Sequence, residues 1–142
     1  MRRRNERGSA LIEVALTLPL LLLVAAGIFE FGRAYQTQQV LTNAVREGAR
    51  VAVLPNQPSG AAQSRVSTYL VNGQLPNAGS ATISVTATTI SIGGTNTPGS
   101  RVSVSYPFSF MVLQPIARLV VGGSDLGAAL TMSASAEMRN EQ

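Results

Sequence analysis

One carboxylate, Glu13, lies in an otherwise apolar segment, "RGSALIEVALTLPLLLL", which extends from Arg7 to Leu23. A charged side chain at the centre of a bilayer costs about 2.5–3.5 kcal/mol on insertion scales, so such residues are rare and usually paired. If this segment enters a membrane, Glu13 should therefore have a partner. The chemistry that it offers is ion pairing in an apolar medium, where an ammonium group would offset part of the cost of burial.

The composition excludes most catalytic sites. The 142-residue chain has no cysteine, histidine or lysine, which rules out disulfides, Cys-His and Ser-His-Asp sites, imidazole zinc ligands and Schiff bases. The acids beyond the apolar segment are scattered: Glu30, Glu47, Asp125, Glu137 and Glu141. This spacing gives little support to a two-carboxylate hydrolase, although such an enzyme is formally open. We therefore predict a protein that is not an enzyme and has no metal or cofactor.

The net charge of +4 comes mostly from the N-terminal tip. The first eight residues hold four of the eleven arginines: Arg2, Arg3, Arg4 and Arg7. The remaining seven arginines and six acids nearly balance, so we predict no nucleic-acid binding. A short basic tip before an apolar run instead indicates an N-terminus that stays in the cytoplasm.

The apolar run has the length of a membrane span. Ser9 to Phe29 would form a helix of about 31 Å, close to the roughly 30 Å thickness of the hydrocarbon layer. Pro19 can be tolerated in such a helix. Glu30 and Arg33, one helical turn apart, are the predicted pair at the outer membrane interface. We predict a transmembrane segment over residues 9–32, in contact with membrane lipid.

Two alternatives remain for this segment. It could be an ordinary anchor in which Glu13 is only tolerated. It could also be a secretory signal cleaved near Ala26, after the small residues "VAA", although Glu13 and Pro19 are unfavourable within such a signal.

The N-terminal third of the chain carries a recognisable pattern. A cut after Gly8 would make Ser9 residue one and Glu13 residue five, which resembles the type IV prepilin signal. The stretch from Gly8 to Val53, with "ALIEVALTLPLLLL", "GIFEFGR" and "NAVREGAR", is similar to the TadE-like family of minor pilins, or pseudopilins, of the tight-adherence (Flp) pilus system. The closing "SASAEMRNE" is a weaker match to the tails of such chains.

The resemblance implies a processing step and an assembly contact. A membrane prepilin peptidase would cut between Gly8 and Ser9, on the cytoplasmic side. Glu13 would then meet the freed amine of a neighbouring subunit. Ser9 stands where classical pilins favour phenylalanine, which leaves N-methylation of the new amine open.

The segment after the membrane, residues 33–53, continues the helical pattern. It has no proline, and apolar residues recur at helical spacing through residues 41–52. Ala44, Gly48 and Ala52 form a row of small residues that would let another backbone approach closely. Alternatively, Gly48 only weakens the helix, by about 1 kcal/mol.

The remaining residues, 54–142, predict an extracytoplasmic α+β domain. A short helix over residues 60–72 is expected, with Ser59 as its N-cap and Gly73 at its end. Three later segments alternate apolar residues with serine or threonine: "ATISVTATTISI", "RVSVSYPFSF" and "ALTMSASAEM". This alternation predicts a three-stranded antiparallel sheet with one packed face and one wet face. The Ser/Thr face could be an adhesive surface, although an ordinary solvated face is the simpler interpretation.

Local irregularities are also predicted within this domain. The alternation changes phase near Thr88–Thr89, which favours a β-bulge or a bend. "GGTNTPGS" is typical of a hairpin loop. Pro107 indicates that pairing is broken on one side of its strand, and Pro115 to Val121 is expected to be a short helical crossover.

Together these features predict a pilin-like α+β protein with a basic leader (residues 1–8) and a long helix over residues 9–53. Its expected role is that of a structural minor pilin in assembly of a tight-adherence pilus, used in adhesion and surface attachment. The expected location is the cytoplasmic (inner) membrane, with the C-terminal domain outside. The expected partners are the prepilin peptidase, the major Flp pilin and other minor pilins, and the inner-membrane assembly platform. Alternatives are a Sec-secreted protein cleaved near Ala26 and a pseudopilin of a type II secretion system.

Overall fold

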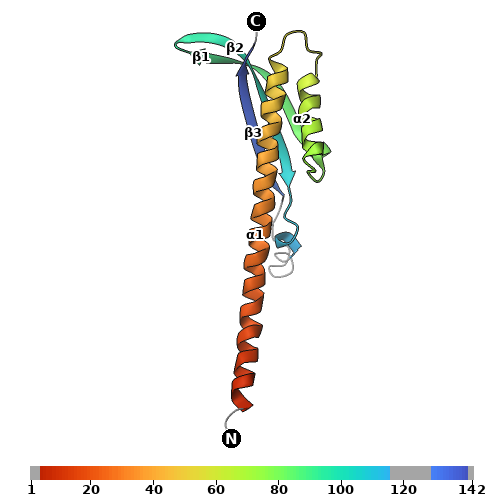
Figure 1. Ribbon diagram of the computed structural model, residues 1–142. Helices are drawn as coiled ribbons and strands as arrows, with labels where there is room; N and C mark the ends of the chain where they lie inside the picture. Colours follow the sequence, from red (N-terminus) through yellow and green to blue (C-terminus); the bar gives the residue numbers. More distant parts are fainter. Residues whose placement is uncertain (1–3, 116–128, 141–142) are drawn as a thin grey trace. The chain divides into compact units, whose positions relative to one another are not determined.

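The computed structural model of the chain describes residues 4–115 and 129–140 (Figure 1). The helices and strands follow in the order α1 (Arg4–Ala52), α2 (Ala61–Asn72), a 3-10 turn η1 (Ala78–Ser80), β1 (Thr82–Ile92), β2 (Thr95–Phe108) and β3 (Leu130–Arg139). The predicted α+β class is confirmed, since a long N-terminal helix, a short second helix and a three-stranded antiparallel sheet are all present.

The chain forms two compact units. Among the described residues, the first unit contains residues 4–33 and 110–115, and the second contains residues 34–109 and 129–140. Helix α1 contributes its N-terminal part to the first unit and its C-terminal part to the second.

Helix α1 begins at Arg4, five residues earlier than the predicted start at Ser9. No proline precedes Gly8, and one glycine weakens a helix by only about 1 kcal/mol, so nothing stops the helix at the predicted leader. The helix continues through Pro19. Within the described residues it is the one helix long and apolar enough to cross a membrane, and its most apolar window is not buried by the rest of the chain.

Helix α2 ends before Gly73 as predicted, but its N-cap residue differs from the predicted one. The N–H of Gly73 donates to the Tyr69 carbonyl (2.9 Å), which closes the last turn. The prediction of Ser59 as N-cap is wrong, because the cap is Gly60 in the left-handed conformation (φ 88°) and no side chain caps the helix. Glycine adopts this conformation without the steric cost that other residues carry.

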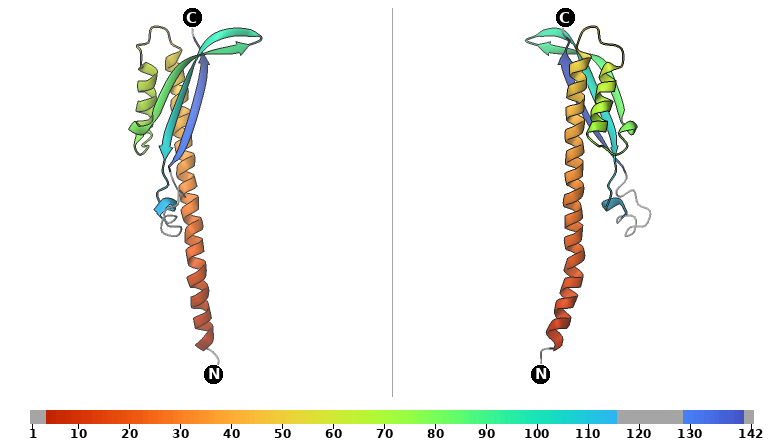
Figure 2. Two further views of the ribbon diagram at one scale, coloured as in Figure 1. Left: turned by 180° about the vertical axis from the view of Figure 1, so that it is seen from behind. Right: turned by 45° about the vertical axis from the view of Figure 1, so that its right-hand side comes forward.

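The sheet has the order β1-β2-β3, with antiparallel neighbours, so β2 is the central strand. In the second unit, α2 and the C-terminal part of α1 cover one face of this sheet, as both views of Figure 2 show. The core between the helices and the sheet is apolar and includes side chains from three elements: Leu41, Val45 and Ala49 of α1, Ala62, Val66 and Leu70 of α2, and Val102, Val104, Tyr106 and Phe108 of β2. The predicted packed face of β2 is therefore the buried one.

Of the β-bulge or bend predicted in the β1–β2 hairpin, the structure has a bend and no bulge, whereas the predicted hairpin loop is wrong. No β-bulge occurs at Thr88–Thr89, because β1 and β2 pair one to one from Thr82↔Ser105 to Ile92↔Thr95. The hairpin instead curves away beyond the end of β3 (Figure 2), as the strong twist of two-stranded ribbons allows. The predicted eight-residue loop is wrong, since only Gly93 and Gly94 turn the chain, both with positive φ (58° and 83°). Two such glycines suit the tight turn that matches strand twist.

The two remaining proline predictions have different outcomes. Pairing with β1 ends at Ser105, so Pro107 pairs only with Thr131 of β3, and the predicted loss of pairing on one side is confirmed. The helical crossover expected over Pro115 to Val121 lies, except for Pro115 itself, outside the described residues.

Candidate functional site

Glu13 lies on a part of α1 whose side chains are exposed. Its neighbours Leu11, Ile12 and Val14 are each more than half exposed. No basic group lies within ion-pair distance of the Glu13 carboxylate among the residues whose side chains the structure describes. The backbone carbonyl of Glu13, and not its carboxylate, accepts a hydrogen bond from the Thr17 hydroxyl (2.8 Å). Glu13 thus presents a carboxylate on an apolar surface, with no partner among the side chains that the structure describes.

Gly8 and Ser9 lie within α1, so the peptide bond between them is helical. A Cβ atom built on Gly8 would meet no other atom within 4 Å, and Ser9 is exposed. The bond is therefore accessible from the side, but a protease must unwind the helix locally to cut it.

Glu30 is a buried acid at the end of the apolar segment, with its side chain fully inaccessible to solvent. Its Oε2 lies 2.9 Å from Arg33 Nη1, one helical turn away. Its Oε1 accepts a hydrogen bond from the backbone N–H of Val112, and the backbone amides of Met111 and Leu113 also face the carboxylate. A buried charge needs a countercharge and hydrogen bonds to be tolerated, and Glu30 has both.

Residues 113–115 are helical, so the amides that face Glu30 belong to the start of a helical turn. The first N–H groups of a helix have no acceptor within the helix. A carboxylate at this end satisfies them and also complements the positive end of the peptide dipoles. Glu30 thus ties the segment after β2 to α1 within the first unit.

The row of small residues on α1 lies in the second unit. Ala44 and Gly48 are buried and Ala52 is half-buried. A Cβ atom at Gly48 would lie 2.4 Å from Val66 Cγ2 of α2 and 3.3 Å from Val102 Cγ1 of β2. At Gly48, therefore, the backbone of α1 approaches this chain's own α2, and the absence of a side chain makes room for Val66.

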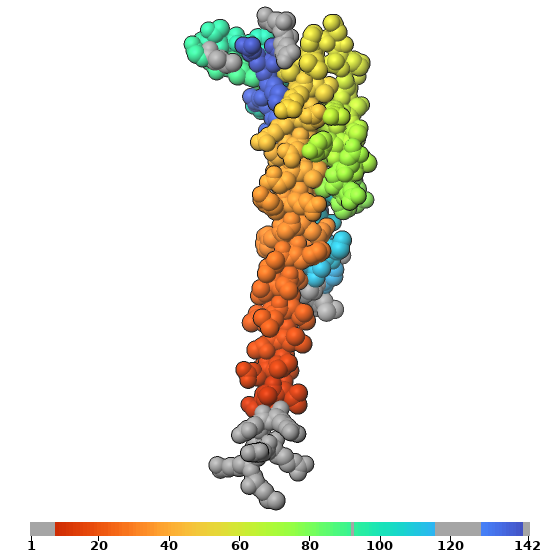
Figure 3. Space-filling view, in the orientation of Figure 1, coloured from red at the N-terminus to blue at the C-terminus, as the bar shows by residue number. Residues whose placement is uncertain are grey.

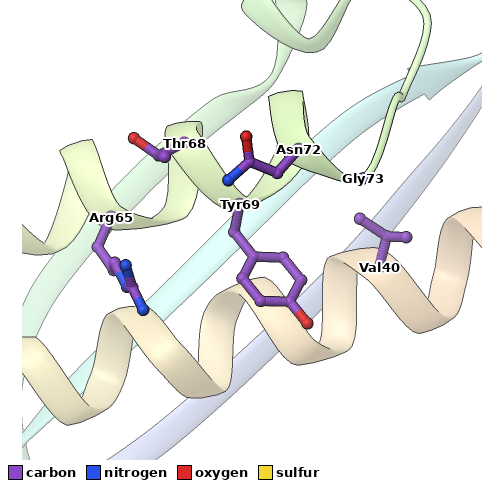
Figure 4. A pocket seen from close by; sticks show the side chains of 6 residues that line it. All are labelled: Val40, Arg65, Thr68, Tyr69, Asn72 and Gly73. Carbon is purple, nitrogen blue, oxygen red and sulfur yellow. The ribbon is translucent and has the colours of Figure 1, made fainter.

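An open groove of about 400 Å³ runs between α1 and α2 and is lined by Val40, Arg65, Thr68, Tyr69, Asn72 and Gly73 (Figure 4). The side chains of Arg65 and Tyr69 extend from α2 toward α1, whereas Thr68 points away. Arg65 Nη2 lies 2.8 Å from Glu47 Oε1 of α1, so its charge is already paired. Because the charge of Arg65 is already paired, we assign this groove to the packing of α2 against α1 and not to a ligand-binding site.

On the wet face of the sheet, polar residues lie opposite one another on neighbouring strands. The hydroxyls of Ser84 and Ser103 lie 2.7 Å apart across β1 and β2, and Ser103 pairs in register with Ser135 of β3. Arg101 and Glu137 form an ion pair across β2 and β3. Among the described residues, no three acids gather where they could hold a metal ion.

Comparison with known proteins locates the recognisable part of the chain. Residues 8–50 match the family model of the TadE-like protein. The predicted resemblance is confirmed over these residues, and the match begins at Gly8 and includes Glu13, Glu30, Arg33 and Gly48. No curated protein and no solved structure is significantly similar to the chain.

The TadE-like match suggests involvement in the Tad pilus system, with pilus components as partners in general. This family is structural rather than catalytic. The long apolar helix that carries the TadE-like residues suggests membrane anchoring, as expected for a protein of a pilus system.

Sequence reasoning identified the pair of Glu30 and Arg33 but missed its third partner. Val112 lies 82 residues from Glu30 in the chain, and it contributes a backbone N–H that no side-chain pattern reveals. The available signal was the uncharged run "FMVL" (Phe110–Leu113), which follows the last residues of β2 and has the composition of a segment in an apolar environment.

Proposed function

We propose that the chain is a minor pilin, or pseudopilin, that acts as a structural subunit in assembly of a tight-adherence (Flp/Tad) pilus used in adhesion and surface attachment. The observation that carries the proposal is Glu13, a carboxylate on an exposed apolar helix without a partner of its own among the described side chains, five residues after the glycine where the TadE-like match begins. A structural subunit obtains such a partner by assembly.

The proposed topology is a single pass through the cytoplasmic membrane. The N-terminal arginines favour a cytoplasmic N-terminus, because basic residues remain on that side. The C-terminal domain then lies outside, and the mature protein is extracted into the pilus at the cell surface.

The proposed maturation is a cut between Gly8 and Ser9 by a prepilin peptidase. The cut creates an ammonium group at Ser9, and Glu13 of one subunit pairs with this group on its neighbour. Pairing offsets much of the cost of placing either charge in lipid, so it favours one axial register between subunits. The further proposed partners are the major Flp pilin, other minor pilins, the inner-membrane assembly platform and membrane lipid.

The test separates assembly from processing with the variant Glu13→Gln. Glutamine keeps the shape of the side chain and removes its charge. Deleting one member of a buried ion pair commonly costs about 3–5 kcal/mol, and half of the low end would already weaken association roughly tenfold. We expect Glu13→Gln to be inserted and cleaved but to lose its pilus partners in a detergent pull-down.

The matched control is Leu21→Ile, which changes only the shape of an exposed apolar side chain on the same helix. It should recover partners as the wild type does. Full recovery of partners by cleaved Glu13→Gln would contradict the assembly contact. Intact-mass analysis of the mature protein addresses processing separately, because a chain beginning at Gly27 would indicate a secretory signal cleaved after Ala26 instead of a pilin leader.

A further inference from the structure

Residues 110–113 lie beside the part of α1 that is proposed to cross the membrane. Val112 lines an apolar groove together with residues of α1, namely Pro19, Leu22, Leu23, Ala25 and Ala26. Figure 3 shows the light-blue atoms of this segment against the orange part of α1. These α1 residues precede Glu30 by 4 to 11 positions, which corresponds to about 6–17 Å along a helix. If Glu30 marks the edge of the hydrocarbon layer, the groove that Val112 lines lies within the acyl chains of the leaflet next to Glu30.

The composition of the segment suits that depth. Phe110, Met111, Val112 and Leu113 are four consecutive apolar residues, and the sequence has no charged residue between Arg101 and Arg118. The Met111 side chain is 61% exposed, and on α1 Ile28 and Phe29 are also mostly exposed. Extensive exposed apolar surface, such as that of α1 and of this segment, marks a contact with another apolar phase.

Backbone amides of the segment have a hydrogen-bond acceptor within the protein, as an apolar environment requires. Lipid supplies no hydrogen bonds, so every backbone N–H at that depth needs a partner within the protein. The Glu30 carboxylate supplies one for the N–H of Val112 and faces those of Met111 and Leu113. Arg33, 2.9 Å from Glu30, balances the charge and has a side chain long enough to extend toward the headgroups.

From this juxtaposition we propose that residues 110–113 form a second membrane contact, seated among phospholipid acyl chains in the leaflet at the Glu30 end of α1. The proposal rests on the membrane anchor of the proposed function. The burial of Glu30 then has a role, because its carboxylate holds the apolar segment against the anchor through the amides of residues 111–113. The chain then touches the bilayer through two segments that are far apart in the sequence.

The experiment uses the absence of native cysteine, since a single introduced thiol can be labelled without background. The full chain with Met111→Cys is labelled with a bimane fluorophore and reconstituted into phosphatidylcholine vesicles whose acyl chains carry bromine. We expect bromine to quench this label as strongly as a label at Ile28→Cys. We expect aqueous iodide to quench it several-fold less than a label at Ser84→Cys, on the wet face of the sheet.

A label at Leu21→Cys reports on the anchor alone. If that label is protected from iodide while the Met111 label is quenched as strongly as the Ser84 label, the second contact is wrong and the anchor stands. If the Leu21 label is itself accessible to iodide, the anchor fails and the second contact fails with it. Because the Met111 side chain is mostly exposed, its replacement leaves the packing of the fold intact.

Discussion

The backbone N–H of Val112 donates a hydrogen bond to the Glu30 carboxylate across 82 residues of sequence. The interaction joins the segment that leaves β2 to helix α1 within the first unit. Because Glu30 is fully buried, its carboxylate has no water to replace a lost protein partner. The attachment of the segment should therefore depend on this side chain.

Glu30→Ala should loosen residues 110–113. The variant leaves the Val112 N–H without an acceptor, and an unsatisfied buried donor costs about 1–3 kcal/mol. Proteolysis follows the population of the open form when opening is fast, so chymotryptic cleavage at Phe110 should accelerate roughly tenfold in detergent. Glu30→Gln retains an acceptor oxygen and should fall between Glu30→Ala and the wild type. Glu47→Ala, at a partly exposed ion pair of the second unit, is the control, and equal cleavage rates in all four proteins would refute the role of Glu30.

Gly8→Ala should leave most of the protein with residues 1–8 attached. Alanine favours the helix by about 1 kcal/mol relative to glycine, and the helix must open for the Gly8–Ser9 bond to be cut. The substitution also adds a methyl group directly beside that bond. Intact-mass analysis of membrane extracts measures the processed fraction. Gly27→Ala, also at a position with no atom within 4 Å, should be processed normally; complete processing of Gly8→Ala would argue against a prepilin cut at this bond.

Gly48→Ala should destabilise the second unit despite its better helix propensity. The added Cβ would lie 2.4 Å from Val66 Cγ2, and overpacking of this kind costs about 1–3 kcal/mol. Val66→Ala removes the clashing methyl groups, so the double variant should be more stable than the sum of the single effects, by about 1 kcal/mol. Thermal unfolding in detergent, followed by circular dichroism, measures the cycle. Gly32→Ala, with no atom within 4 Å, serves as the control, and additive effects at Gly48 and Val66 would contradict the close packing.

Leu70→Ala should destabilise the attachment of α2 far more than Arg65→Gln does. Leu70 is fully buried, and removing such a side chain costs about 2–5 kcal/mol. The ion pair of Arg65 with Glu47 is partly exposed to solvent, so its loss should cost less than about 1 kcal/mol. The free energies of unfolding of both variants, measured with the same denaturant, give the comparison. A larger loss for Arg65→Gln would show that charge, and not apolar burial, holds α2 to α1.

Periodicity was enough to predict which helices and strands form, although not all of their ends. The alternation in "RVSVSYPFSF" predicted Val102, Val104, Tyr106, Phe108 and Phe110 on one face. The first four are buried against the helices, whereas Phe110 lies beyond the end of β2 and is half-buried. The predicted second helix, residues 60–72, differs from α2 by one residue at its start. These predictions succeeded because burial acts on every second residue of a strand and on every third or fourth residue of a helix.

Features that depend on a single backbone conformation or on a distant partner were not predictable in this way. Ser59 has the usual chemistry of an N-cap, but Gly60 ends the preceding turn in a left-handed conformation and takes that position. The phase change near Thr88–Thr89 indicated a β-bulge or a bend without deciding between them, and the ribbon curves without an extra residue. The small residue at Gly48 indicated a close approach without identifying Val66 as the neighbour. The partner of Glu30 is a backbone amide, which every residue possesses, so composition could not identify it.

The start of α1 at Arg4 has a consequence for the proposed cut after Gly8. In a continuous α-helix the amides of residues 9–12 donate to the carbonyls of residues 5–8. A cut after Gly8 removes all four of those acceptors at once and leaves an ammonium group in front of the stranded amides. The cut would thus turn an internal part of the helix into a helix N-terminus, where the free amides and the ammonium group carry positive charge. A negative group from outside the subunit would stabilise this end. If the proposed cut occurs, the subunit would therefore need a neighbour's carboxylate only after the leader has been removed.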